Sequence, residues 1–359
     1  MKLGLIGLPK SGKTTTFNAL TRSDAEVAEY TSGKVEPNVA VVNVEDPRIN
    51  RLSEMYQPKR TIYATIDFMD FVGVDRSEGQ ELFSGPAMGL VKTSDALAIV
   101  VRNFTNDVLD STMGPAEPVR DADAVASELI LSDLVLVETR LERIEADHKR
   151  GKKTPQSQAE QKVLMMLHEA LSDEKPIRDI ELTADQRKTI SGFQFLSSKP
   201  VMVIVNSDED RYGSSSRALE ELSKRYTTVE FAGNFEMELA QLEDEEEAQV
   251  FMADLGIEES ARTRLTTIAY DLLGLISFFT VGPDEVRAWT IHQGESAVDA
   301  AGTIHSDLAR GFIRAECFHY DSLIEAGSEK EVRSSGQFRL EGKEYEVQDG
   351  DILNIRFSV

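Results

Sequence analysis

Hydrophobic residues in the first part of the chain form short runs that end at turn-forming residues. The run Lys2–Ile6 stops at Gly7, and apolar positions return with helical spacing over Thr14–Leu20. This pattern predicts a strand, a glycine-rich turn and a helix. Three further runs are typical of buried strands: Thr65–Phe71, Ala96–Val101 and Pro200–Asn206. Because helical segments separate these runs, we expect an α/β fold with a parallel sheet covered on both faces.

Between residues 123 and 195 the pattern changes to long helices. Leucines recur at helical spacing on both sides of the basic stretch His148–Pro155, which Gly151 interrupts. Two antiparallel helices joined at this stretch are the simplest interpretation. Strand-like runs lie before and after the helices, so we predict a helical hairpin inserted into the sheet domain.

The last part of the chain alternates between short strand-like segments and turns. We expect strands at four places: Arg287–Ile291, Gln337–Leu340, Glu344–Val347 and Ile352–Phe357. Tight turns are indicated by Glu341-Gly342-Lys343 and Asp349-Gly350-Asp351. This pattern predicts a small C-terminal α+β domain.

Composition narrows the class of protein. The 359 residues include 63 acidic and 39 basic side chains, a net charge of −24, and a single cysteine, Cys317. The cysteine cannot form an intramolecular disulfide, and this fits a reducing cytoplasm. No apolar run approaches the roughly 20 residues that span a bilayer, so we expect a cytoplasmic protein without membrane partners.

Because the chain is so acidic, any nucleic-acid contact must come from a local basic patch. The dense candidate is the predicted hairpin tip: Lys149, Arg150, Lys152 and Lys153. These residues form either an RNA contact or a solvated turn.

The stretch Gly7–Thr14, GLPKSGKT, matches the phosphate loop at every required position. Its glycines allow successive backbone N–H groups to point at a phosphate, and Lys13 is expected to bridge the β- and γ-phosphates. The Thr14 hydroxyl is expected to bind Mg²⁺. The helix that opens at Lys13 adds its positive end to the same anion. We therefore predict that the chain binds a nucleoside triphosphate together with Mg²⁺.

A second motif follows the buried run that begins at Thr65. Asp70-Phe71-Val72-Gly73 has the form DxxG, in which the aspartate reaches Mg²⁺ and the Gly73 N–H senses the γ-phosphate. A water-orienting glutamine follows this glycine in Ras-like enzymes, whereas Val74 stands here. Valine cannot position water, so we expect intrinsic hydrolysis to be slow or to use another group.

The base site is expected at the end of the Pro200–Asn206 run. Asn206-Ser207-Asp208-Glu209 occupies the place where GTPases carry Asn-Lys-x-Asp. Glu209 is one methylene longer than the guanine-binding aspartate, and Ser207 replaces the lysine that covers the ring. We therefore expect weakened selection of guanine and a preference for ATP over GTP.

Taken together, these motifs resemble the YchF family, the Obg-like ATPases, over nearly the whole chain. Besides GLPKSGKT, DFVG and the NxxE form, the similar segments are Val35–Asn38, Asp46-Pro47-Arg48, Glu285–Ile291, Ala301–Asp307 and Gly311–Ala315. The resemblance implies a cytoplasmic ATPase with relaxed discrimination against GTP, a Ras-like domain with an inserted hairpin, and association with ribosomes or RNA. It also implies that the C-terminal domain is a TGS module, a ubiquitin-like β-grasp fold.

The chain departs from that family's pattern around the nucleotide. Lys10 stands where the family has asparagine, which in related potassium-dependent NTPases helps to hold K⁺. Its ammonium is either a built-in replacement for the monovalent cation or an exposed lysine. The family's Mg²⁺-binding threonine falls on Lys34, so Thr31 or Ser32 would have to substitute for it. The glycine-rich stretch after DxxG is also altered, over Asp75–Pro86.

We therefore predict three domains: a nucleotide-binding domain at 1–122 and 196–276, a hairpin at 123–195 and a TGS domain at 277–359. The predicted catalytic residues are Lys13 and Gly73, and the predicted metal ligands are Thr14 and Asp70. The predicted nucleotide-binding residues are Pro9, Lys10, Ser11, Gly12, Lys13, Thr14, Thr15, Asn206, Ser207 and Glu209. We expect a monomeric regulatory NTPase with slow turnover, which contacts the ribosome or RNA through the hairpin tip and the TGS domain. The alternatives are a guanine-specific GTPase switch and a scaffold that hardly hydrolyses its nucleotide.

Overall fold

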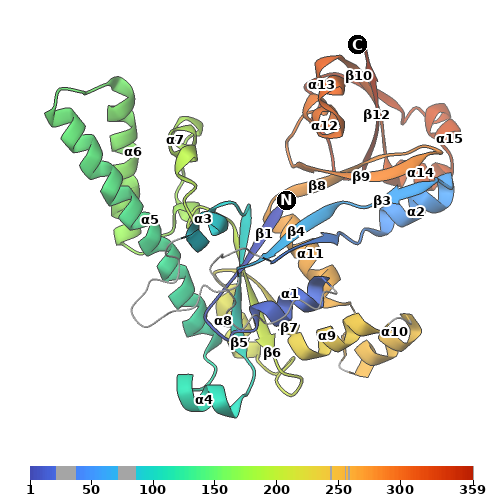
Figure 1. Cartoon of the computed structure of the whole chain (residues 1–359). Helices are drawn as coiled ribbons and strands as arrows, with labels where there is room; N and C mark the ends of the chain where they lie inside the picture. Colours follow the sequence, from blue (N-terminus) through green and yellow to red (C-terminus); the bar gives the residue numbers. More distant parts are fainter. Residues whose placement is uncertain (22–37, 72–85, 243–244, 255, 258, 359) are drawn as a thin grey trace. The chain divides into compact units, whose positions relative to one another are not determined.

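A computed structural model describes residues 1–21, 38–71, 86–242, 245–254, 256–257 and 259–358. The chain divides into two compact units, which are described separately below (Figure 1). Unit 1 comprises Met1–Val41 and Asp67–Arg262, and unit 2 comprises Val42–Ile66 and Thr263–Val359.

The centre of unit 1 is a six-stranded sheet in the order β2-β4-β1-β5-β6-β7. Its strands are β1 (Lys2–Ile6), β2 (Asn38–Asn43), β4 (Thr65–Asp70), β5 (Ala96–Asn103), β6 (Val201–Ser207) and β7 (Thr227–Ala232). From β4 to β7 neighbouring strands are parallel, which confirms the predicted parallel sheet. All residues of β5 and β6 are buried, as expected for central strands covered on both faces.

Helices surround this sheet. They are α1 (Lys13–Thr21), α3 (Pro86–Lys92), α4 (Asp107–Met113), α8 (Ser216–Ser223), α9 (Gly233–Gln241) and α10 (Glu245–Asp254). The chain then enters α11 (Ala261–Leu272), of which all but the first two residues belong to unit 2. One core cluster joins Leu97 and Ile99 of β5 to Val125 and Leu129 of the long helix α5 (Pro118–Lys149). The parallel order places the carboxyl ends of β1, β4, β5 and β6 along one edge, where ligands bind in such folds.

The predicted hairpin is present as α5 (Pro118–Lys149) and α6 (Pro155–Ser172), shown in green in Figure 1. The first helix begins at Pro118 rather than at Asp123, because its first turns belong to the core of unit 1. Thr154 begins the second helix with a capping box to Ser157. Three short helices follow: η1 (Ile177–Asp179), α7 (Ala184–Ile190) and η2 (Ser191–Phe193). Buried Asp133 of α5 accepts the N–H groups of Leu196 at 2.9 Å and Ser197 at 2.7 Å, which fixes the return to β6.

Unit 2 contains a second sheet in the order β11-β10-β12-β8-β9-β3. Its strands are β3 (Arg60–Ile62), β8 (Leu275–Thr280), β9 (Glu285–His292), β10 (Phe312–His319), β11 (Arg339–Glu341) and β12 (Asp351–Phe357). Its helices are α2 (Pro47–Tyr56), α12 (Ala297–Ile304), α13 (Ser306–Arg310), α14 (Tyr320–Ala326) and α15 (Glu329–Ser334). Ala297, Ala300 and Ala301 of α12 pack in a core with Phe278 of β8 and Leu353 of β12. The sheet and helices of unit 2 thus confirm the α+β fold that the sequence predicts for the C-terminal part of the chain.

Two features of unit 2 differ from the sequence predictions. The segment Glu344–Val347 forms only a single bridge, between Ser296 and Glu346. The segment Val42–Ile66 folds with unit 2, although the predicted nucleotide domain included it. The reason is the parallel pairing of β3 with β9, in which Arg60, Thr61 and Ile62 lie opposite Glu285, Val286 and Arg287.

Candidate nucleotide-binding site

The phosphate loop lies between β1 and α1 and is closely packed on its inner side. Gly7 has a φ of 155°, and a Cβ atom there would lie 2.3 Å from the Val100 carbonyl oxygen. Gly12 has a φ of 95°, and a Cβ atom there would lie 2.0 Å from Asn206 Nδ2. Only glycine fits either position, because each combines unusual backbone angles with a close neighbour. The two glycines thus allow the loop to adopt the conformation that the motif predicts.

The Lys13 ammonium is held over the same loop. Its Nζ donates to the carbonyl oxygens of Gly7 at 3.1 Å and Leu8 at 3.0 Å. Lys13 is also the first residue of α1, whose first-turn N–H groups have no partner within the helix. An ammonium group and a helix N-terminus thus meet at one place, an arrangement suited to an anion.

Asp70 joins the end of β4 to the start of α1. Thr14 Oγ1 donates to Asp70 Oδ2 at 2.9 Å. The aspartate is 0% exposed, and its Oδ1 makes no hydrogen bond. Burial raises the pKa of Asp70, although the Thr14 hydrogen bond, the nearby Lys13 charge and a weaker interaction with the Asn38 side chain oppose this shift. A buried carboxylate oxygen without a partner, beside a hydroxyl group, is an all-oxygen donor set of the kind that Mg²⁺ prefers. The residues present therefore fit the predicted metal.

Asn206 lies beneath the phosphate loop. Its Nδ2 donates to the Ser11 carbonyl oxygen at 3.1 Å, and the residue is 4% exposed. The side chain occupies the space between Gly12 and Gly233, the first residue of α9. The contact that the structure gives Asn206 is thus to the loop backbone.

The other residues of the predicted base motif have different surroundings. Ser207 is 3% exposed, and its Oγ accepts from Asn103 Nδ2 and donates to Glu230 Oε1, both at 2.7 Å. Asp208 accepts the backbone N–H of Thr105 at 2.8 Å and so joins the loops after β5 and β6. Glu209 is exposed. Asp208 is half-buried, so Glu209 is the most exposed of the three residues that follow Asn206 in this motif.

The remaining predicted residues fall into two groups. In the phosphate loop, Pro9 is half-buried, Lys10 is exposed with a φ of 62°, and Ser11 is buried with no hydrogen bond to its Oγ. Thr15, in the first turn of α1, lies next to Gly233. Predictions on Thr31, Ser32, Lys34, Gly73, Val74 and Asp75–Pro86 concern residues outside the described ranges, apart from the backbone of Pro86 at the start of α3.

Sequence reasoning missed two residues of the site. Gly233 packs against Asn206 and Thr15, and a Cβ atom there would lie 2.5 Å from Asn206 Oδ1. Asn103 donates to both Ser207 and Ser215 at 2.7 Å. A signal was available for both, because each stands at the carboxyl end of a sheet strand, where such sites form.

Three further predictions concern surfaces and metals. Lys149, Arg150, Lys152 and Lys153 are all exposed at the hairpin tip. Among the described residues there is no group of three or more His, Cys, Asp or Glu side chains that could hold a metal ion. In the same described ranges, no helix combines the length and the apolarity that crossing a bilayer requires.

Comparison with known proteins places this chain in a family. A family model described as "50S ribosome-binding GTPase" matches residues 2–207, and one described as "Protein of unknown function (DUF933)" matches residues 275–358. The chain is similar to the "Ribosome-binding ATPase YchF" of Bacillus subtilis (strain 168), at 39% identity over 366 residues, covering 99% of each chain. The protein of the same name from Haemophilus ducreyi is 38% identical over 365 residues, covering 100% of this chain and 99% of that one.

A solved structure agrees with these relatives. The Schizosaccharomyces pombe YchF GTPase matches with a TM-score of 0.85 and 31% identity, covering 99% of this chain and 97% of that chain. The similarity thus extends over both units. The chain belongs to the YchF family of P-loop NTPases.

Proposed function

We propose that this protein binds a nucleoside triphosphate with Mg²⁺ in the loop Gly7–Thr14, hydrolyses it slowly and prefers ATP to GTP. The observation that carries the proposal is the contact between Thr14 and Asp70, which leaves one buried carboxylate oxygen without a hydrogen bond. Such an oxygen is costly to bury unless a ligand or metal compensates for it. The Lys13 ammonium and the N-terminus of α1 supply the matching site for phosphates.

Each residue has a defined part in binding. Lys13 would exchange its bonds to the loop carbonyl groups for bonds to β- and γ-phosphate oxygens, and the first N–H groups of α1 would bind the same phosphates. Thr14 and Asp70 would hold Mg²⁺, which when bound neutralises negative charge on the phosphate oxygens. Asn206 would support the loop from below, and Gly73 would sense the γ-phosphate.

The preference for ATP rests on Glu209 and Ser207. In the structure Ser207 points into the protein, where it contacts Asn103 and Glu230, so it does not cover a base as the lysine of guanine-specific proteins does. Glu209 is exposed and longer than the aspartate that selects guanine. The relatives' names fit both readings, since two are called ATPases and one a GTPase. Competition between ATP and GTP for the purified protein separates them: displacement of labelled ATP by GTP at lower concentration than by ATP would establish the guanine-specific alternative.

Slow hydrolysis follows from two substitutions in the sequence. Val74 stands in place of a water-orienting glutamine, and Lys34 stands where the family's pattern has a Mg²⁺-binding threonine. A single-turnover assay with excess protein measures the chemical step directly. Release of phosphate in the presence of Mg²⁺ supports a slow ATPase, whereas bound, intact nucleotide after many hours supports the scaffold alternative.

We propose the ribosome as the partner, with the hairpin tip as a contact to its RNA. Both curated relatives described above are named ribosome-binding, and the tip offers four exposed cations on a chain of net charge −24. Reversing Lys149, Arg150, Lys152 and Lys153 to glutamate should abolish co-sedimentation with ribosomes while nucleotide binding is unchanged. Contacts to phosphates also predict that binding weakens steeply with salt. Co-sedimentation that survives these changes would exclude the tip as the contact. The expected state is a cytoplasmic monomer.

A further inference from the structure

The segment Val42–Ile66 belongs to unit 2, but the chain enters and leaves it through strands of the unit 1 sheet. Its flanking strands, β2 and β4, pair in the sheet of unit 1, yet the segment itself belongs to unit 2. Within unit 2 its helix α2 packs on β9, and its strand β3 pairs with β9. The far end of β4 is Asp70, the proposed magnesium ligand. A short stretch of continuous chain therefore connects the nucleotide site to the packing of unit 2.

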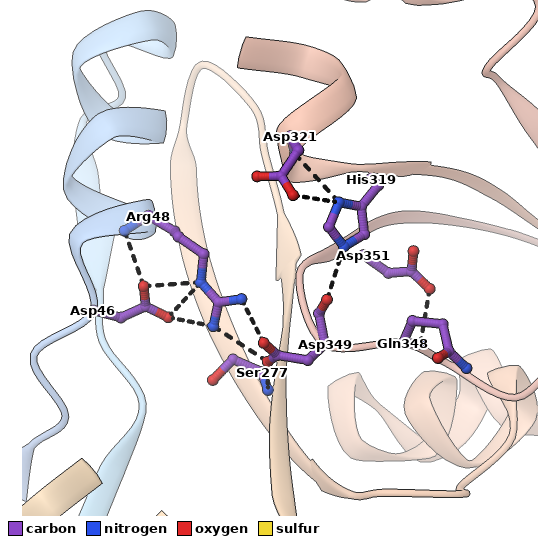
Figure 2. A network of polar contacts seen from close by, with 8 residues as sticks. All are labelled: Asp46, Arg48, Ser277, His319, Asp321, Gln348, Asp349 and Asp351. Carbon is purple, nitrogen blue, oxygen red and sulfur yellow. Dashed lines mark hydrogen bonds and ion pairs between the residues drawn. The ribbon is translucent and has the colours of Figure 1, made fainter. Parts of the chain in front are cut away.

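Arg48, near the start of α2, fixes this segment within unit 2 (Figure 2). Its Nε and Nη2 donate to Asp46, the shortest bond being 2.8 Å from Nη2 to Oδ2. Its Nη1 donates to Asp349 Oδ2 at 2.6 Å, and Nη2 donates to Asp349 Oδ1 at 3.2 Å. Burial alone would lower the pKa of Arg48, but the hydrogen bonds to the two aspartates outweigh it and raise that pKa. One planar guanidinium group thus holds two carboxylates at once, which a lysine cannot do.

The turn that carries Asp349 is itself held from several sides. Ser277 of β8 donates its N–H to Asp349 Oδ1 at 2.9 Å and accepts the Gly350 N–H at 2.8 Å. His319, at the end of β10, has its Nε2 at 2.9 Å from the Asp349 carbonyl oxygen, and its Nδ1 accepts the N–H of Asp321 at the start of α14. The turn Gln348–Asp351 thus connects β8, β12 and α14 to the Arg48 side chain (Figure 2).

These ion pairs are partly exposed, so their contribution to stability is small. They instead fix geometry, because a bidentate contact sets the orientation of the two groups as well as their distance. Asp46 and Arg48 belong to one of the segments in which the sequence resembles the YchF family, and neither residue has a part in nucleotide binding as proposed above. The contact ties α2 to the turn Gln348–Asp351.

We propose that Arg48 couples nucleotide binding to unit 2: occupation of the phosphate loop is transmitted along β4 and α2, through the Arg48–Asp349 contact, to the turn Gln348–Asp351. This inference rests on the proposed nucleotide-binding function. Arg48 is a positioning residue, because it acts through Asp349 and touches no nucleotide. The consequence is a unit 2 whose local dynamics report whether nucleotide is bound.

Hydrogen–deuterium exchange of the full chain, with and without saturating Mg²⁺–ATP, tests the proposal after calorimetry has established the nucleotide affinity of each variant. In the wild type, nucleotide should slow exchange at least about twofold in peptides covering both α2 and Gln348–Asp351. In Arg48→Ala the nucleotide should still bind, and the response should remain in β4 but vanish at Gln348–Asp351. Lys59→Ala is the matched control, because it removes an exposed ion pair from the same segment to Asp284 and leaves Arg48 intact. This control should respond as the wild type does.

A second variant guards against misfolding. Asp349→Asn keeps an acceptor for the Ser277 N–H and removes the charge that Arg48 binds, so it should also lose the distant response. Wild-type protein that binds nucleotide with unchanged exchange at Gln348–Asp351 would overturn the coupling alone. A response there that persists in folded Arg48→Ala or Asp349→Asn would overturn it as well. Failure of the wild type to bind any nucleotide would instead refute the proposed function and with it this inference.

Discussion

Replacing Asn206 by alanine separates the two roles that this residue could have. The side-chain amide donates to the Ser11 carbonyl oxygen at 3.1 Å within the phosphate loop and is almost fully buried. Alanine removes the donor and leaves the buried Ser11 carbonyl oxygen without the hydrogen bond that Asn206 gave it. If Asn206 supports the loop, the loss must affect every nucleotide that uses the loop, whatever its base.

The magnitude follows from the buried carbonyl group. Leaving one buried acceptor unsatisfied costs about 1–3 kcal/mol. The nucleotide-free loop of the variant can avoid this cost by leaving its phosphate-binding conformation, and binding must then restore that conformation. The expected loss of affinity is therefore up to about 5- to 150-fold. Because the bond is to the loop backbone, we expect the same factor for ATP, GTP and ADP. A residue that contacts the base would give different factors for adenine and guanine nucleotides.

Calorimetric titration of the variant with Mg²⁺ complexes of ATP, GTP and ADP measures these factors. Asn106→Ala is a matched control, because Asn106 caps α4 through the Leu109 N–H at 3.0 Å and does not contact the phosphate loop. Its nucleotide affinities should equal those of the wild type. Asn206→Ala affinities that fall for one base only, or that do not fall at all, would refute the support role.

Three more substitutions test separate parts of the account. Asp70→Asn removes a buried charge. In urea titration without nucleotide, the free energy of unfolding of this variant should equal that of the wild type or exceed it by on the order of 1 kcal/mol. The same variant should lose the stabilisation, about 2.7 kcal/mol at 100 times Kd, that Mg²⁺–nucleotide gives the wild type, and a wild-type response would count against the metal role. For Cys317, burial raises the thiol pKa to about 12, so between pH 9 and 12 the folded state keeps a proton that the unfolded chain releases. The protein's free energy of unfolding should therefore fall as the pH rises through this range, and Cys317 should contribute at most about 1.4 kcal/mol per pH unit to the fall. In Cys317→Ala the fall with pH should be less steep. If the exposed Lys10 replaces a monovalent cation, hydrolysis should be equal in K⁺ and Na⁺ and should become K⁺-dependent in Lys10→Asn; K⁺ stimulation of the wild type would contradict this role.

Local patterns made one part of the fold predictable. The strand before Gly7, the turn and the helix from Lys13 follow from residues close together in the sequence. Asp70 could be placed because it ends a buried run, and parallel strands bring their carboxyl ends to one edge. The hairpin was predictable because its helices are long and its turn is marked by Gly151.

Contacts between distant residues were not predictable in the same way. Asn206 resembles a base-binding residue by its motif, but its partner Ser11 lies 195 positions away, and no local signal reveals that bond. The strand Arg60–Ile62 is too short for a periodicity signal, so its pairing with β9, and the transfer of Val42–Ile66 to unit 2, escaped sequence reasoning. The Arg48–Asp349 contact belongs to the same class.

Calorimetric titration of the wild type and Lys13→Ala with Mg²⁺–ATP tests the phosphate-loop assignment most directly. The wild type should bind one nucleotide per chain. The variant should lose about 10- to 150-fold in affinity, because a charged hydrogen bond is worth about 1.5–3 kcal/mol. A wild type that binds no nucleotide, or a Lys13→Ala protein that retains full affinity, would contradict the account.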